Sequence, residues 1–302
     1  MSEKPIGFVP RFRVPRFFTV DLLIKVGSLL FALALVSAFY SSYVEPTVEQ
    51  ITIEGRVQAR TSGEGYIAPR SAAVIVKDPE QRWEITFWVW AMILLSLKLS
   101  RLARENRMLG LDYLGLRPGE QIQPADAAAR LKDIEFALGE RPVWRDRLLP
   151  NIILSALHRF HATGSIMDAA GSVKERADTA ANEYEADLSL VRYIAWAIPA
   201  IGFIGTVRGI GEALAQAGKA IAGDITGVVD ALGLAFNSTL VALILAIPLM
   251  FLLFVIQGRQ DRFFVDLLSY CDAHLISRMR VPEPEPGAKD AEAVEAALPR
   301  SV

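Results

Sequence analysis

The chain has 302 residues, of which 52% are hydrophobic and 22% charged, with a mean hydropathy of +0.30 and a formal net charge of -2. It is too apolar for a typical soluble domain and too charged to lie wholly in a membrane, so spanning helices should alternate with a soluble part. Its 32 Lys and Arg are spread along the chain, which argues against nucleic acid as a partner. The single cysteine, Cys271, excludes an internal disulfide and is interpreted as a reduced bystander.

Four stretches approach the length of about 20 mostly apolar residues that crossing a lipid bilayer requires. They are predicted at residues 26–44, 83–99, about 193–214 and 232–256. The first apolar run is too long for a secretory signal, so we expect it to remain in the protein. The predicted fold is an all-α polytopic membrane protein with four transmembrane helices.

Basic residues set the predicted orientation. They crowd the N-terminal lead and the exits of the second and fourth spans, and cytoplasmic flanks are enriched in Lys and Arg. We therefore expect a multi-pass protein of the bacterial inner membrane with both termini in the cytoplasm. Residues 45–82, although also basic, are predicted to face the periplasm because the other three flanks outweigh them. Alternation at 51–53 and an apolar run at 73–76 are consistent with a small β-hairpin in this loop.

The soluble middle of the chain reads as helices broken near Pro118, Pro142 and Gly164. Residues 173–191 contain no Gly or Pro and should extend the third span as helix. The predicted segments are, in order, a cytoplasmic lead (1–25), the first span (26–44), a periplasmic loop (45–82), the second span (83–99), a helical cytoplasmic region (100–190), a channel core (191–261), a cytoplasmic helix (262–281) and a disordered tail (282–302).

Three glycines in the third span, Gly202, Gly205 and Gly209, are spaced to let another helix approach closely. At 100° per residue, Gly202, Thr206 and Gly209 fall on one narrow face. Thr206 should therefore lie in the groove where a neighbouring helix packs.

The fourth span has a matching face of small side chains and no charged residue. Ala235, Thr239, Ala242 and Ala246 line this face. Packing alone explains such stripes in many membrane bundles, so the geometry leaves open whether the two threonines act in function.

Two further pairs of residues stand out in these spans. Arg208 and Glu212 are four residues apart and can form an ion pair, either at an outer channel mouth or as an ordinary interfacial pair. Pro199 and Pro248 each free a backbone carbonyl, which suits either a hinge or a simple packing kink.

Two motifs in these spans match a known family. Residues 202–210, Gly-Phe-Ile-Gly-Thr-Val-Arg-Gly-Ile, resemble the Gly-x-x-Gly-Thr-Val-x-Gly-Ile signature of the MotA/TolQ/ExbB proton channel family. Residues 231–248 resemble the family's final span, with Thr239 nine residues before Pro248. The resemblance covers about residues 188–261. Its motifs are closer to TolQ and ExbB, whereas four spans resemble the flagellar stator MotA, and Arg208 stands where relatives often have an apolar or aromatic residue.

The resemblance implies the channel subunit of a proton-driven motor. It implies a homopentamer around two copies of a small single-span partner of the ExbD, TolR or MotB type, whose intramembrane aspartate carries the proton. The family's channel threonines correspond to Thr206 and Thr239. The ion, H+ or Na+, and the driven process, whether envelope maintenance, import or motility, stay open.

Two other functions are weighed against this one. The first is a non-conducting oligomeric membrane scaffold, which would use the same packing. The second is a membrane enzyme using His158 and His161, which is disfavoured because zinc sites need three or four ligands and no Cys or third His accompanies the pair. With no Walker loop or nucleophile elbow, we expect neither a cofactor nor a metal.

Overall fold

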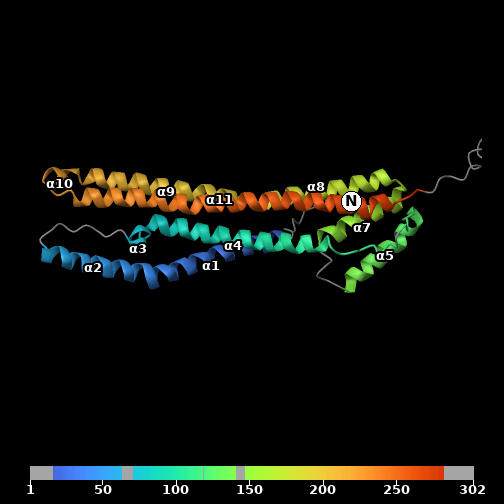
Figure 1. The fold of residues 1–302 in the computed structure, drawn as a ribbon, viewed down its shortest axis with the longest axis horizontal. Helices are drawn as coiled ribbons and strands as arrows, with labels where there is room; N and C mark the ends of the chain where they lie inside the picture. Colours follow the sequence, from blue (N-terminus) through green and yellow to red (C-terminus); the bar gives the residue numbers. More distant parts are fainter. Residues whose placement is uncertain (1–15, 63–70, 118, 141–146, 282–302) are drawn as a thin grey trace, which may run out of the picture. The chain divides into compact units, whose positions relative to one another are not determined.

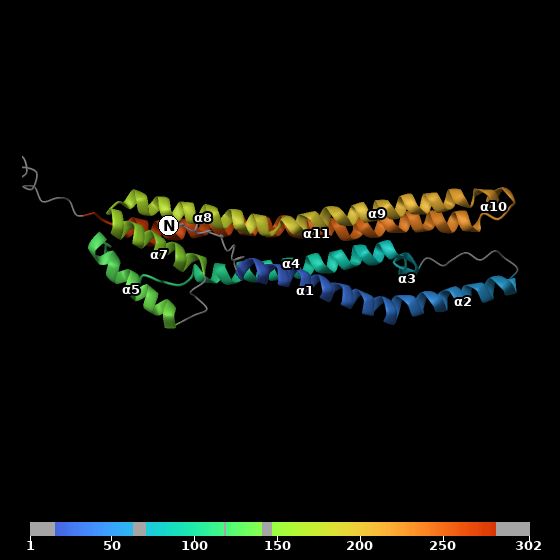
Figure 2. The same cartoon turned by 180° about the vertical axis from the view of Figure 1, so that it is seen from behind.

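The computed structural model describes residues 16–62, 71–117, 119–140 and 147–281 (Figures 1 and 2). These residues are mainly helical, and the only strand-like feature described among them is an isolated bridge between Ile122 and Met279. Four helical stretches are long and apolar enough to cross a membrane: Val20–Gly55, Pro79–Met108, Ile166–Ala215 and Thr226–Arg278. The predicted all-α polytopic fold is confirmed. The tail predicted at 282–302 and most of the lead lie outside the described residues.

The chain divides into two compact units. The membrane unit comprises residues 1–99 and 188–256, and the second unit comprises residues 100–187 and 257–302. Helix α4 (Pro79–Met108) and helix α11 (Thr226–His274) each contribute residues to both units.

The membrane unit begins with α1 (Arg16–Phe39), the π-helix η1 (Tyr40–Val44) and α2 (Glu45–Ser62). Pro46 explains the π turn, because a proline in a regular helix lacks an N–H and its ring crowds the preceding turn. The wider turn, in which the N–H of Glu45 donates to the carbonyl of Tyr40, makes room for that ring. Helix therefore continues past the predicted end of the first span at residue 44.

The hairpin considered for residues 51–53 and 73–76 is wrong. The first segment lies in α2, and the second lies in and just after α3 (Ala72–Ile75). An alternation of three residues is too short to favour a strand over an established helix. The hydroxyl of Thr52 also stays within the helix, donating to the carbonyl of Val48 at 2.7 Å.

The core of the membrane unit lies where α4, α9 (Ser189–Ala215) and α11 pack together, with α9 and α11 side by side in Figures 1 and 2. Its fully buried side chains include Leu95, Ile198 and Leu249. Trp90 joins α4 to α1, since its indole N–H lies 3.2 Å from the carbonyl of Lys25 and 3.0 Å from the hydroxyl of Ser28.

Two prolines lie inside the long helices of this core. Both α9 and α11 continue as helix through Pro199 and Pro248 respectively. The two helices are joined by α10 (Ala217–Ile221) and a turn in which Gly223 has a φ of 98°. Asp224 closes this turn by accepting the N–H of Thr226 at 3.1 Å.

The second unit is built from the end of α4, α5 (Pro124–Glu140), α7 (Leu148–Thr163), α8 (Ile166–Asp187), the end of α11 and η2 (Ile276–Arg278). The predicted break at Gly164 is present, because this residue caps α7 with a φ of 65°. The break near Pro142 falls on residues outside the described ranges.

Two helix boundaries bear on the predicted segments. Only Leu188 separates α8 from α9, so the helix before the third span extends it almost without interruption. The helix predicted at 262–281 corresponds to the last part of α11, which ends at His274, followed by η2. No glycine or proline interrupts the chain between Pro248 and His274 except Gly258, which a helix tolerates.

Candidate ion path in the membrane unit

The small-residue faces predicted on the third and fourth spans pack against each other. A Cβ atom at Gly202 would lie 2.5 Å from the Cβ of Ala242. A Cβ atom at Gly209 would lie 2.7 Å from the carbonyl oxygen of Ala231 and 2.8 Å from the backbone nitrogen of Ala235. Glycine at these positions therefore allows α9 and α11 to approach more closely than any side chain would permit. Ala246 belongs to the buried core formed by α4, α9 and α11 and is 5% exposed.

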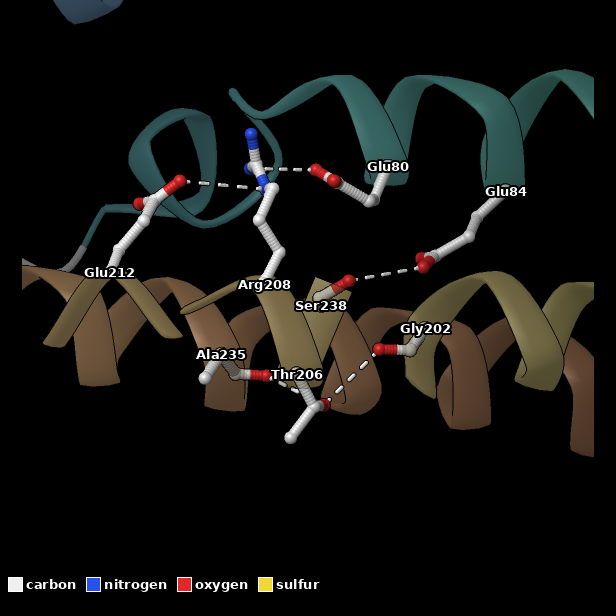
Figure 3. A network of polar contacts seen from close by, with 8 residues as sticks. All are labelled: Glu80, Glu84, Gly202, Thr206, Arg208, Glu212, Ala235 and Ser238. Atoms are coloured by element: carbon white, nitrogen blue, oxygen red, sulfur yellow. Dashed lines mark hydrogen bonds and ion pairs between the residues drawn. The ribbon is translucent and has the colours of Figure 1, made fainter. Parts of the chain in front are cut away.

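The hydroxyl groups of Thr206 and Thr239 meet in this contact and are within hydrogen-bond distance of each other. Thr206 Oγ1 lies 3.1 Å from the carbonyl oxygens of both Gly202 and Ala235, as Figure 3 shows. Thr239 Oγ1 lies 3.3 Å from the same carbonyl of Gly202. Both threonines are partly exposed. A hydroxyl has one hydrogen and two lone pairs, so this pair can also accept a hydrogen bond from an approaching donor.

Arg208 makes two ion pairs. The one predicted from the sequence joins its Nε to Glu212 Oε1 at 3.9 Å. A closer one joins its Nη2 to Glu80 Oε2 on α4 at 2.8 Å (Figure 3). The sequence analysis missed Glu80, because it lies 128 residues away along the chain. Arg208 thus links α9 to α4 as well as to the next turn of its own helix.

Asp78, which immediately precedes α4, lies close to these charges. Burial raises the pKa of its carboxyl group above the ordinary value, and the positive charges of Lys77 and Arg208 oppose that rise. Its Oδ2 atom is buried and has no hydrogen-bond partner among the described residues.

A buried carboxyl group in α4 was also missed. Glu84 is 0% exposed, and its Oε1 accepts the hydroxyl of Ser238 on α11 at 3.4 Å (Figure 3). Gln81, one turn earlier, is also 0% exposed. A signal was present in the sequence, since Gln81 and Glu84 are three residues apart and fall on one helix face beside the apolar centre of the second span.

The two histidines considered for catalysis are both exposed on α7. Nδ1 of His161 lies 2.8 Å from the carbonyl oxygen of Pro124. Within the described ranges, no group of three or more His, Cys, Asp or Glu converges in a way that could hold a metal ion.

Residues 145–267 match the model of the MotA/TolQ/ExbB proton channel family. This segment is similar to that family. It includes α7, α8, α9 and most of α11, so it contains both threonines and extends beyond the two motifs that carried the resemblance. Comparisons with curated proteins and with solved structures gave no significant match.

The match of residues 145–267 to a proton channel family and the four apolar helices together indicate an integral membrane protein. The family is a channel family and not an enzyme family. The family match leaves out α1, α2 and all of α4, and hence both Glu80 and Glu84.

Proposed function

We propose that the chain is the channel subunit of a proton-driven, stator-like motor in the bacterial inner membrane. It would couple ion flow to force through a single-span partner of the ExbD, TolR or MotB type, with two partner copies inside a homopentamer. The observation that carries this proposal is the meeting of the Thr206 and Thr239 hydroxyls where α9 packs against α11. The match of residues 145–267 to the proton channel family supports the channel activity.

The threonine pair suits a carboxyl group that arrives from the partner. A protonated carboxyl donates a hydrogen bond, which the hydroxyl oxygens can accept. An ionised carboxylate only accepts, so it must compete with the carbonyls of Gly202 and Ala235 for the hydroxyl hydrogens. The affinity of the partner's aspartate for its proton would therefore differ beside the pair and away from it. Proton transfer would in this way be coupled to movement of the partner.

The rest of the proposed arrangement follows the distribution of charge and of prolines. Both termini face the cytoplasm, and residues 45–82 face the periplasm, where Arg208 and Glu212 line the outer mouth. Pro199 and Pro248 serve as hinges in α9 and α11.

The proposal is tested with the chain and the single-span protein that co-purifies with it, reconstituted in vesicles containing a pH-sensitive dye. Thr206→Val and Thr239→Val each remove a hydroxyl at nearly constant volume. We expect each to lower proton flux at least tenfold while the mass of the assembled complex stays unchanged.

The matched control is Thr86→Val in α4. Thr86 is 0% exposed, and its hydroxyl donates to the carbonyl of Arg82 within the same helix at 2.7 Å. Flux should survive this substitution. Undiminished flux in both Thr206→Val and Thr239→Val would contradict the role of the threonine pair. No flux in the unaltered complex would instead support a non-conducting scaffold.

A further inference from the structure

One face of α4 carries buried polar atoms that have no hydrogen-bond partner among the described residues. They are both polar side-chain atoms of Gln81, Oε2 of Glu84 and Nε1 of Trp88. Spacings of three and four residues place these side chains on one side of the helix. Asp78 Oδ2, just before the helix, is a fifth such atom, on a fourth residue. We call these four residues the polar track of α4.

Buried polar atoms in folded proteins nearly always have a hydrogen-bond partner, either in the protein or in ordered water. The requirement is stricter inside a membrane, because lipid offers no alternative partner. Four residues spaced three or four apart, each with a buried polar atom that lacks a hydrogen-bond partner, therefore indicate a shared partner that extends along the helix. Water is the smallest molecule that can both donate to the carboxyl oxygens and accept from the indole N–H.

Glu84 is the member of the polar track within α4 itself that can bind and release a proton, since Asp78 precedes the helix. Among the described residues it forms no ion pair with a Lys or Arg, whereas Glu80, four residues earlier, pairs with Arg208 at 2.8 Å. Of these two carboxyl groups on one helix, Glu80 thus has a cation beside it that favours the ionised form, and Glu84 has none. An ionised carboxylate buried in a membrane protein without a cation is strongly unfavourable, so such a group keeps a proton or marks an ion path.

The other ionisable groups around Glu84 have partners of their own. On α4, Arg82 lies over the ring of Tyr40, with 5.2 Å between its guanidinium carbon and the ring centroid. Tyr40, from η1, donates its hydroxyl to the carbonyl of Val76 at 2.6 Å. From α11 the contact is Ser238, which is uncharged.

We infer that Glu84 is a proton-binding group supplied by this chain itself, reached through the polar track of α4 and separate from the aspartate expected in the partner. Its Oε2 takes a proton from water in the track and returns it there, while Oε1 keeps the hydrogen bond from Ser238. Because Ser238 is the residue before Thr239, the α11 helix that contributes Thr239 to the threonine pair also contacts Glu84.

The first experiment needs no partner. The purified chain in lipid nanodiscs is measured at neutral pH by infrared spectroscopy, in the region where a protonated carboxyl group absorbs. We expect a carboxylic acid band that shifts in D2O within minutes and is lost in Glu84→Gln. The control Glu45→Gln changes a carboxylate that is 61% exposed, and it should leave the band intact.

Each result decides a part of the inference. A band that survives in Glu84→Gln, or no band in the unaltered chain, overturns the assignment of the proton to Glu84. A band that is lost in Glu84→Gln but fails to exchange with D2O overturns the water-filled track. An unchanged unfolding temperature confirms that the Glu84→Gln protein is folded. Glu84→Asp, which keeps a carboxyl group, is the second variant and should retain a carboxylic acid band.

A second experiment rests on the proposed function. In the vesicle assay Glu84→Gln should lower proton flux several-fold and Glu84→Asp should restore part of it, while Glu45→Gln has no effect. Unaltered flux in Glu84→Gln would remove Glu84 from the conduction path. Failure of the unaltered complex to conduct would contradict the proposed function but leave the infrared result standing.

Discussion

The hydroxyl of Ser238 on α11 occupies the space that a side chain at Gly205 on α9 would need, and the Cγ atom of Glu80 lies 3.2 Å from the same point. Gly205 therefore marks the place where α4, α9 and α11 come together. Any side chain there would displace the serine that donates to Glu84. The signature glycines of the third span thus serve two contacts, because Gly202 and Gly209 face α11 whereas Gly205 also faces α4.

Alanine at Gly209 should destabilise the membrane unit. Its Cβ would lie 2.7 Å from the carbonyl oxygen of Ala231, so the backbone of α11 would have to move. We expect a loss of about 1–3 kcal/mol, as for other overpacked contacts, seen as a lower unfolding temperature in nanodiscs. Gly211→Ala is the matched control, because nothing lies within 4 Å of a Cβ there. Equal unfolding temperatures for the two variants would contradict the close contact of α9 and α11.

Loss of the Glu105 carboxylate should destabilise the second unit. Glu105 accepts hydrogen bonds from Arg147 Nη1 at 3.2 Å and from the N–H of Leu148 at 3.1 Å, so it caps the start of α7. Its side chain is 5% exposed. Glu105→Ala should cost about 3–5 kcal/mol, the usual effect of removing one partner from a buried ion pair. Glu105→Gln should cost less, because it can still accept from Leu148.

The control for this substitution is Glu120→Ala. Glu120 likewise pairs with an arginine, Arg130, and accepts a backbone N–H, that of Arg117, at 2.9 Å. Its side chain is 34% exposed, and exposed pairs of this kind contribute only about 0–1 kcal/mol. Chemical denaturation of both variants measures the difference. A Glu120→Ala protein as unstable as Glu105→Ala would show that burial does not set the strength of these pairs.

Gly164→Ala should weaken the turn between α7 and α8. Gly164 has a φ of 65°, a conformation that costs a residue with a side chain about 1–2 kcal/mol, although nothing lies within 4 Å of a Cβ at this position. The effect would therefore come from backbone strain alone. Gly171→Ala in α8 is equally unobstructed, but there alanine should stabilise the helix by about 1 kcal/mol. The two substitutions should shift the unfolding temperature in opposite directions.

Cys271 should resist thiol reagents in the folded protein. Its side chain is 0% exposed within the core of the second unit, so maleimide has no access without unfolding. Mass spectrometry should show modification only after denaturation. An exposed position on the same unit, Ser277→Cys in a Cys271→Ala background, should react within minutes. Rapid labelling of native Cys271 would show that this core opens readily.

The sequence predicted those features that depend on residues close together along one helix. The faces containing Thr206 and Thr239 follow from helical periodicity, and the family motifs supplied their pairing. The contacts of Glu80 and Glu84 were not predictable in this way, because their partners Arg208 and Ser238 lie 128 and 154 residues away along the chain. Nothing local to α4 says which helix it packs against.

The error at residues 51–53 has a different cause. Short alternation is a weak signal, and here it is overridden by a helix that enters the segment and continues through Pro46. The π turn that allows the helix to continue is explained by Pro46, and the alternation of Ile51, Thr52 and Ile53 does not indicate this turn.

That π turn also sets the rotational phase of the helix after it. Val36, Tyr40, Val44 and Val48 recur every four residues and pack in one cluster with residues of α4, although in a regular α-helix each such step would drift by about 40° around the axis. A π turn holds more residues per revolution, so each residue rotates less around the axis. The π turn between Val36 and Val48 therefore offsets part of this drift. Deleting a single residue of the π turn, Ser41 or Ser42, would change the rotational phase of α2 by about 100°. The side of α2 that packs against α4 would then face away from it. One missing residue would thus abolish the packing of a whole helix without removing any apolar side chain.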